Sequence, residues 1–332
     1  MGIFRSIFTV AHVVIVLLLG ATMLNAYVPP KVFPLLNLLS LAFPFLMIAN
    51  LLLCFFWVFS WRKRAFVFLL ISTLFLTPVR RWINYSEPKS EENSIKVISY
   101  NARIVGWETI NPTSDFIDEQ NADVILMQEC GDRKIVKPKS SKYAIIDDYK
   151  IMTIYTKHPI IEKGLILENR MAGNADYADI DINGKRIRFI NVYLEPYKLY
   201  EDLQETPENI DNTEKKAKTI VGKMLPIFKK HQEQVEKIAA FIKKSPYPVI
   251  LAGDFNAVPN SYEYYKLSEG LQDAFLESGK GSGTSFHDYI FPLRIDYIFA
   301  SKEFESNSFK VKRNLGLTSD HYPVFAEFSF KN

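Results

Sequence analysis

Three long apolar runs fill most of the first eighty residues, and the short segments between them carry the charges. The runs cover Ile7–Leu24, Leu35–Phe59 and Ala65–Val79. A helix needs roughly 20 apolar residues to cross the hydrocarbon core of a bilayer, so the first two runs are long enough and the third is short. Residues suited to the membrane interface flank the third run: Trp61, Arg64, Arg80 and Trp82. We therefore predict a transmembrane region over residues 1–83 with three helices, the alternative being a third helix that lies in the interface.

Basic residues between the runs predict the orientation of the chain. If all three runs cross, the densest basic cluster, Arg62-Lys63-Arg64, lies on the same side as Arg5. Positive charges favour the cytoplasmic side, which puts the N-terminus inside. Three crossings then place residues 95–332 outside the cytoplasm, whereas two crossings would leave them inside it.

From residue 95 the pattern changes to short runs rich in Val, Ile and Tyr, which are typical of strands. Residues 84–94 are polar and predict a linker. Strands are predicted over Ile95–Tyr100, Val124–Met127, Lys150–Tyr155, Tyr177–Ile182, Lys185–Val192, Val249–Ala252, Ile295–Phe299 and Pro323–Phe330. Asn183-Gly184 predicts a tight hairpin turn, and helices are predicted over Thr113–Gln120, residues 198–244 and Ser261–Leu267. This alternation favours packed sheets with helices outside them.

Composition excludes several classes of protein. With 48% hydrophobic residues, the chain is not disordered. Residues 1–94 hold eight basic and three acidic residues, which leaves 32 basic and 34 acidic residues for the rest. That near-neutral balance is not typical of a general nucleic-acid binder. The two cysteines, Cys54 and Cys130, exclude a disulfide framework and a cysteine-based zinc site.

Polar residues cluster where the predicted strands begin or end. They are Asn101, Glu129, Asp254, Asn256, Asp296, Asp320 and His321. If these strands share a sheet edge, the side chains converge there. Each residue alone has a simpler explanation, such as a solvated strand cap or a turn whose side chains bond their own backbone. The combination favours a site for metal-assisted phosphoester hydrolysis.

Three of these residues are hard oxygen donors. Glu129 and Asp320, with the amide oxygen of Asn101, suit Mg²⁺ or Mn²⁺ rather than zinc. Such an ion offsets the charge of a phosphate and stabilises the leaving oxygen. We therefore predict a magnesium-type site formed by these three residues.

The other four residues suit proton transfer and positioning. His321 is able to take a proton from water or to hold a phosphoryl oxygen, and Asp296 would fix its tautomer. Asp254 and Asn256, two apart on one strand, point the same way and would position water and a non-bridging oxygen. Together with the metal site they form a predicted catalytic centre.

Five short motifs occur in order along the chain: Ser99-Tyr100-Asn101, Gln128-Glu129, Gly253-Asp254-Phe255-Asn256, Arg294-Ile295-Asp296-Tyr297 and Ser319-Asp320-His321. In these motifs the sequence resembles the endonuclease/exonuclease/phosphatase superfamily, which includes exonuclease III, deoxyribonucleases and neutral sphingomyelinases. The resemblance covers roughly residues 95–332. It implies an α/β fold, a four-layer α-β-β-α sandwich of two mixed sheets, and a metal-dependent phosphodiesterase or nuclease. It also implies a structural or phosphate-binding role for Arg294.

One motif departs from part of that superfamily. Many phosphodiesterase members carry Asn-x-His-Leu where this chain has Asn191-Val192-Tyr193-Leu194. The exonuclease III branch has tyrosine there, so Tyr193 is a candidate catalytic residue and Asn191 a candidate substrate-binding residue. A phenol donates a hydrogen bond to a phosphate but does not supply the charge of an imidazolium. We expect retuned activity, the alternative being a catalytically inactive member that serves as a surface binding module.

Two substrate classes remain open, nucleic acid and a phospholipid headgroup. Residues 214–244 hold nine lysines, which would follow nucleic-acid phosphates, lie on anionic lipid, or form a solvated helix face. The N-terminal runs resemble those of a membrane-anchored bacterial subset of the superfamily. That resemblance implies a multi-pass protein of the bacterial inner membrane, and no feature of the sequence indicates a protein partner.

Overall fold

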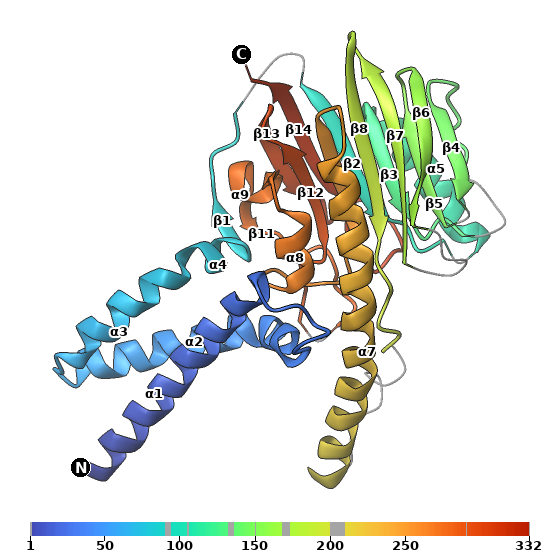
Figure 1. Cartoon of the computed structure of the whole chain (residues 1–332). Coiled ribbons are helices and arrows are strands. Elements are labelled where there is room, and N and C mark those ends of the chain that lie inside the picture. The colour runs from blue at the N-terminus through green and yellow to red at the C-terminus, as the bar shows by residue number, and fades with distance from the viewer. Residues whose placement is uncertain are drawn as a thin grey trace.

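The computed structural model divides the chain into a helical N-terminal part and a larger sandwich of sheets (Figure 1). It describes residues 2–89, 94–104, 106–131, 136–149, 151–167, 173–199, 210–289 and 291–331. The last N-terminal helix ends at Arg80, and the chain enters the sandwich through the short strand β1 (Ile83–Tyr85), which pairs with β11 (Lys280–Ser282). The first residues of the predicted linker therefore belong to a strand.

The first two apolar runs form long helices, α1 (Gly2–Met23) and α2 (Leu35–Phe59), with the 3-10 turn η1 (Leu24–Ala26) between them. Both helices are long and apolar enough to cross a membrane. The third run is divided into α3 (Arg64–Ser72), η2 (Thr73–Phe75) and α4 (Leu76–Arg80), each too short to span by itself. Length and composition thus support two spanning helices, and the third crossing remains a prediction.

Two six-stranded mixed sheets form the sandwich. The first has the order β13 (Phe304–Val311), β14 (Val324–Phe330), β2 (Ile95–Asn101), β3 (Val124–Gln128), β5 (Met152–Thr156) and β4 (Ala144–Tyr149). The second has the order β10 (Leu271–Asp273), β12 (Asp296–Ser301), β9 (Val249–Asp254), β8 (Lys185–Tyr193), β7 (Asn174–Ile182) and β6 (Ile160–Leu167). Only β2–β3 and β8–β9 pair in parallel among these neighbours. Both sheets are therefore mixed, as the resemblance implied.

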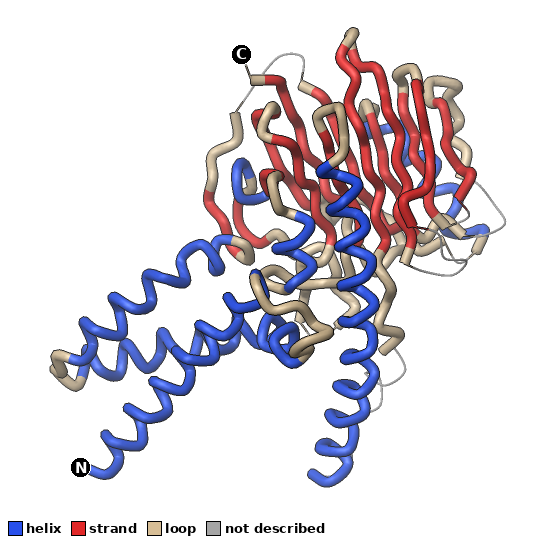
Figure 2. The backbone as a smooth tube through the Cα atoms, viewed as in Figure 1, coloured by secondary structure: helices blue, strands red, loops and turns tan. Residues whose placement is uncertain are grey.

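Helices cover the outer faces of the two sheets (Figures 1 and 2). Side chains of α5 (Trp107–Gln120) pack on the first sheet, and those of α7 (Ile210–Lys243) and α8 (Tyr262–Leu267) pack on the second. The short helix α9 (Ala274–Ser278) packs at the end near β13. Between the sheets, Val97 and Leu126 of the first meet Phe189 and Ile250 of the second in one apolar core. The predicted four-layer α-β-β-α sandwich is thereby confirmed.

The strands that the sequence did not predict lie mostly at sheet edges. Strands β4, β6, β10 and β13 are the edge strands of their sheets, and an edge strand keeps polar residues that weaken its apolar signal. Helix α5 begins six residues before its predicted start. The prediction placed the start after Pro112, but Pro112 lies within the helix. The helix predicted over 198–244 appears as α7; residues 200–209 lie outside the described part of the chain, and Lys198 and Leu199 are not helical.

Polar side chains of α2 bond directly into the sandwich. The Asn37 amide donates to both carboxylate oxygens of Glu263, at 3.0 and 2.8 Å, and its oxygen accepts from the Tyr262 backbone N–H at 3.0 Å. Glu263 is fully buried and lies 2.9 Å from Nδ1 of His231 in α7. An apolar cluster also crosses the junction: Leu19, Phe43, Phe75, Phe286, Leu293 and Ile295. The helical part and the sandwich therefore form one packed body.

Candidate active site

The sheet register brings the predicted polar residues to one edge of the sandwich. Val97 of β2 faces the core between the sheets, and Asn101, four residues later, points to the same side. Ile250 of β9 faces the same core, as does Asp254 at the end of that strand. Asp296 opens β12 as the register partner of Asp254. The strict alternation of strand faces thus assembles residues from three strands at one place.

Backbone turns with positive φ direct two further residues out of their strands. Glu129 follows β3 with φ of 51°, and Asn256 follows β9 with φ of 46°. Gly253 has φ of 150°, and a Cβ there would lie 1.9 Å from the Val192 carbonyl oxygen of β8. Only glycine permits this close approach. The close approach of β8 to β9 therefore explains why the first residue of the Gly-Asp-x-Asn motif is glycine.

His321 and Asp296 form a buried pair at the centre of the site. Nδ1 of His321 lies 2.8 Å from Oδ2 of Asp296, which also accepts a hydrogen bond from Ser285 Oγ at 2.5 Å. Nε2 of His321 lies 3.8 Å from Oδ2 of Asp254. Burial alone would lower the pKa of His321, but the carboxylates of Asp296 and Asp254 raise it to about 10. The pair keeps a proton on Nδ1 and turns Nε2 toward Asp254.

Asn101 links two carboxylates beside this pair. Its amide nitrogen donates to Glu129 Oε1 at 2.9 Å and to Asp254 Oδ2 at 3.0 Å, and the Tyr193 hydroxyl donates to Glu129 Oε1 at 2.9 Å. Burial raises the pKa of Asp254 to about 7. The amide oxygen of Asn101 accepts from the Arg103 backbone N–H at 3.2 Å. In this arrangement the amide nitrogen of Asn101 faces the carboxylates. The amide must therefore rotate if its oxygen is to bind a metal ion, as predicted.

Two members of the site were not predicted. Arg103 donates to Asp320 Oδ2 at 2.7 Å, and the Ser285 hydroxyl holds Asp296. Arg103 follows Asn101 by two residues, which is the only signal in the sequence that points to it. Ser285 lies in a loop with no periodic pattern, so nothing in the sequence indicated its contact.

Asn256 is held by local bonds at the same edge. Its backbone N–H donates to Asp254 Oδ1 at 2.8 Å, and its amide donates to the Leu194 carbonyl at 3.0 Å and to Asp254 Oδ2 at 3.3 Å. Such contacts are typical of a turn in which Asp and Asn side chains bond the nearby backbone, the simpler explanation considered for this motif. They hold Asn256 on the wall of a cavity at this edge.

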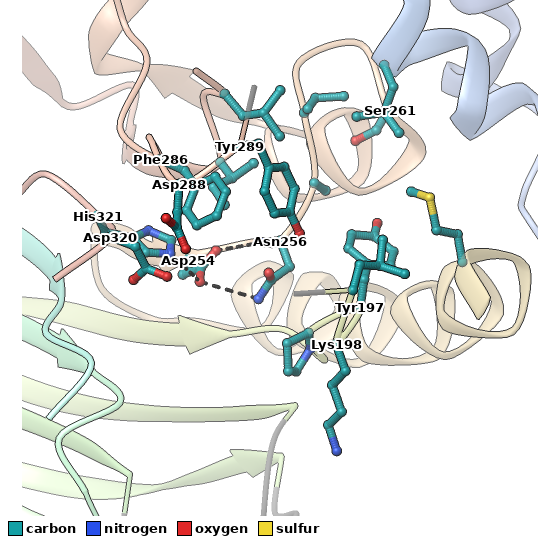
Figure 3. A pocket seen from close by; sticks show the side chains of 18 of the residues that line it. Tyr197, Lys198, Asp254, Asn256, Ser261, Phe286, Asp288, Tyr289, Asp320 and His321 are labelled. Atoms are coloured by element: carbon teal, nitrogen blue, oxygen red, sulfur yellow. Dashed lines mark hydrogen bonds and ion pairs between the residues drawn. The ribbon is translucent and has the colours of Figure 1, made fainter. Parts of the chain in front are cut away.

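One cavity of about 560 Å³ connects these residues. Figure 3 shows His321, Asp320 and Asp254 together at one end of it, with Asn256 beside them. Six of the predicted residues line the cavity: Glu129, Tyr193, Asp254, Asn256, Asp320 and His321. Asn101 and Asp296 bond to these wall residues from behind. Glu129 and Asp320, from distant parts of the chain, therefore face the same space.

Two residues predicted to bind substrate, Asn191 and Arg294, do not line the cavity. Asn191 is fully buried between the sheets, where its oxygen accepts from Gln128 at 2.6 Å and its amide donates to the Met127 carbonyl at 3.1 Å. Arg294 is fully buried as well, and donates to both oxygens of Asp273 at 2.6 and 2.9 Å. Burial of Arg294 agrees with the structural role, the other of the two that the resemblance implied. Sequence position placed both residues near the site, but their side chains point into the packed interior.

The charges at the site fit a hard divalent cation. Five carboxylates gather here with two cationic side chains: Glu129, Asp254, Asp288, Asp296 and Asp320 with Arg103 and His321. Oδ1 of Asp296 has no hydrogen-bond partner among the described residues. Asp254, Asp296 and His321 also present ligand atoms within 4.8 Å of one another. An excess of negative charge with oxygen donors is the environment that Mg²⁺ and Mn²⁺ prefer.

Comparison with known proteins gives two family matches. A model described as the Endonuclease/Exonuclease/phosphatase family matches residues 108–321, and a model described as a domain of unknown function matches residues 5–82. No curated protein matches the chain significantly. The first match covers more than half of the chain and contains most of the residues described above.

Solved structures share the fold of the sandwich. D. rerio TDP2 complexed with single-strand DNA product is 18% identical, with a TM-score of 0.53, and the alignment covers 72% of this chain and 100% of that one. A protein of the same family from Bacteroides vulgatus is 17% identical, with a TM-score of 0.51 and the same coverage. At such identities the likeness shows the fold alone. With the family match, it shows that the chain belongs to the endonuclease/exonuclease/phosphatase family of metal-dependent phosphoester hydrolases.

Proposed function

We propose that the chain is a membrane-tethered phosphoester hydrolase that uses Mg²⁺ or Mn²⁺. The observation that carries this proposal is the buried His321–Asp296 pair beside a carboxylate cluster on the wall of one cavity. Phosphoester hydrolysis needs a group that manages the proton of the attacking water and charges that organise the phosphate. The His321–Asp296 pair supports the first requirement, and a divalent ion held by the carboxylates would supply the second.

His321 is the proposed general acid–base group. Asp296 holds the proton on Nδ1, which leaves Nε2 to exchange a proton with water or to bond a phosphoryl oxygen. Asp254 and Asn256, on the same wall, position the water and a non-bridging oxygen. The Tyr193 hydroxyl donates to Glu129 and keeps that carboxylate in place.

A divalent ion, when bound, offsets the phosphate charge and stabilises the leaving oxygen. Glu129 and Asp320 would hold it, and Asn101 would join them with its amide turned over. Arg103 would keep Asp320 directed toward the cavity through their hydrogen bond. Glu129, Asp320 and Arg103 line the cavity, and Asn101 lies directly behind Glu129.

Exposed apolar side chains support the membrane tether. Among the described residues, large apolar side chains that are exposed lie in the first 85 residues, except Ile161 and Phe291. Leu52 of α2 is 64% exposed and Phe66 of α3 is 77% exposed. In water these apolar side chains would be exposed at a cost in free energy, whereas a bilayer would bury them in its hydrocarbon core. The run α3–α4 returns from the far tip to the sandwich (Figure 1), so we propose three crossings of a bacterial inner membrane, with Arg62-Lys63-Arg64 cytoplasmic and the sandwich outside.

The test is hydrolysis by the full chain in lipid nanodiscs, because the helices and the sandwich share one packed core. With Mg²⁺ or Mn²⁺, we expect release of nitrophenol from bis(p-nitrophenyl) phosphate, and we expect EDTA to abolish it. His321→Ala should lose activity as well. The matched control is His158→Ala, because His158 also pairs with a carboxylate, Asp123, at 2.8 Å but lies away from the cavity.

Two results would contradict the proposal. Activity in His321→Ala equal to the wild type would remove the histidine from the mechanism. A folded wild-type chain that hydrolyses no phosphoester in a panel of nucleic-acid, lipid and sugar phosphates would favour the alternative, an inactive binding module.

A further inference from the structure

Away from the catalytic residues, the cavity has an apolar wall built from segments far apart in the sequence. Helix α7 contributes Ile220, Met224 and Phe228, which are spaced by four residues and so lie on one helix face. Helix α2 contributes Leu41, which packs with Met224 and Phe228 in one cluster. The wall therefore joins an N-terminal helix to the outer helix of the sandwich.

The two ends of the cavity differ in chemistry (Figure 3). One end holds the carboxylates and imidazole of Asp254, Asp320 and His321. At the other end Ser261 stands next to the ribbon of the N-terminal helices, and Tyr197 and Tyr289 lie between. The cavity thus runs from the proposed reaction centre toward the helices that we propose to lie in a membrane.

Exposed aromatic side chains mark the end near α2. Phe291 lines the cavity and stacks edge to face on Phe45 of α2, with ring centroids 5.1 Å apart. These rings are 40% and 51% exposed. Further along α2, Ile48 and Leu52 are 57% and 64% exposed. An apolar surface is therefore continuous from the exposed side of α2 to the cavity wall.

We propose that the substrate is a lipid phosphoester whose phosphate lies among the catalytic residues and whose hydrocarbon chain lies along the wall between α2 and α7. This inference rests on the proposed function and names its substrate class. A volume of about 560 Å³ is of the size that holds a drug-sized ligand and exceeds the need of a phosphate alone. The apolar wall gives the chain a surface to bury.

The charge on the cavity lining favours a lipid over a nucleic acid. Nucleic-acid binding needs cations that follow successive phosphates. Apart from His321, the cationic side chains that line the described cavity are Arg103, which bonds Asp320, and Lys198. One phosphate with an apolar substituent matches this lining better than a polyanion does.

The test is binding of uncleavable alkylphosphonates, from butyl to octyl, to the full chain in nanodiscs with Mg²⁺. Isothermal titration calorimetry measures Kd, and empty nanodiscs correct for partition into lipid. We expect Kd to fall by roughly two- to fourfold for each added methylene. Met224→Gln should flatten this dependence, whereas Ile227→Gln, a matched change on the same helix outside the cavity lining, should keep it.

Equal Kd values for butyl- and octylphosphonate in the wild type would overturn the proposal, whether or not the variants fold. Tighter binding of a single-stranded oligonucleotide than of octylphosphonate would also overturn it, in favour of nucleic acid. Because phosphonates are not hydrolysed, this result is separate from the activity assay. Hydrolysis without chain-length dependence contradicts only the lipid proposal, and chain-dependent binding without hydrolysis contradicts only the hydrolase proposal.

Discussion

At the scale of single residues, the site depends on hydrogen bonds that fix where protons lie. Asp296 accepts from His321 and from Ser285, so its carboxylate has one orientation. The motif residues could be proposed from the sequence because they stand next to the beginning or end of a predicted strand. Ser285 could not, because its contact joins a loop to a strand through tertiary packing alone.

Asp296→Asn tests the orientation of His321. The amide would favour the wrong tautomer, and we expect kcat to fall by about 10²- to 10⁴-fold, as for carboxylate–histidine pairs elsewhere. The melting temperature should change little. The control is Asp123→Asn, which alters the equivalent partner of His158 away from the cavity. A kcat within twofold of the wild type for Asp296→Asn would rule out the proposed role.

The pKa of His321 gives a second residue-scale prediction. The neighbouring carboxylates outweigh burial and raise this pKa to about 10, so the imidazole is protonated at pH 7. A divalent ion among those carboxylates would offset their charge and lower the pKa. By linkage, Mg²⁺ affinity should rise as the pH rises from 7 to 9, with proton release on binding. Histidine NMR titrations with and without Mg²⁺ measure this, and an unchanged pKa at saturating Mg²⁺ would disagree with it.

At the scale of elements, turn chemistry and periodicity identified the central strands well. Asn183 and Gly184 have φ of 55° and 80°, as a type I′ hairpin requires. Strands β6 and β13 escaped prediction because they lie at edges, where partial exposure permits polar residues. Inner strands are buried on both faces, and their continuous apolar runs are what a sequence shows most clearly.

Two glycines offer substitutions of opposite effect. Gly184→Ala places a side chain at positive φ and should destabilise the fold by about 1–2 kcal/mol. Gly222→Ala lies inside α7, where the new Cβ would meet no side chain within 4 Å, and should stabilise the helix by about 1 kcal/mol. Thermal unfolding of the full chain in nanodiscs measures both. Melting temperatures that both rise would contradict the positive φ at Gly184, and melting temperatures that both fall would contradict the helical position of Gly222.

At the scale of the whole molecule, the docking of the N-terminal helices on the sandwich could not be predicted. The sequence showed apolar runs and a polar stretch between them and the strands, which indicated separate parts. The structure shows α2 bonded to Glu263 and packed along the same cavity as the site residues. Long-range contacts of this kind have no local pattern, so the apolar cavity wall was also missed.

Asn37→Ala tests this junction. The substitution removes two hydrogen bonds to the buried Glu263 carboxylate, and we expect a loss of about 1–3 kcal/mol. The control is Asn314→Ala, at an exposed position. Thermal unfolding in nanodiscs, with limited proteolysis of residues 84–89, measures the effect. Equal stability of both variants would show that the two parts are independent.

The central claim is that carboxylates from distant strands hold one hard cation beside His321. A crystal structure of the full chain grown with Mn²⁺, with anomalous diffraction at the manganese edge, tests it most directly. The account expects one strong peak between the carboxylates of Glu129 and Asp320. A peak elsewhere on the molecule, or no peak in crystals that still hydrolyse a phosphoester, would contradict it.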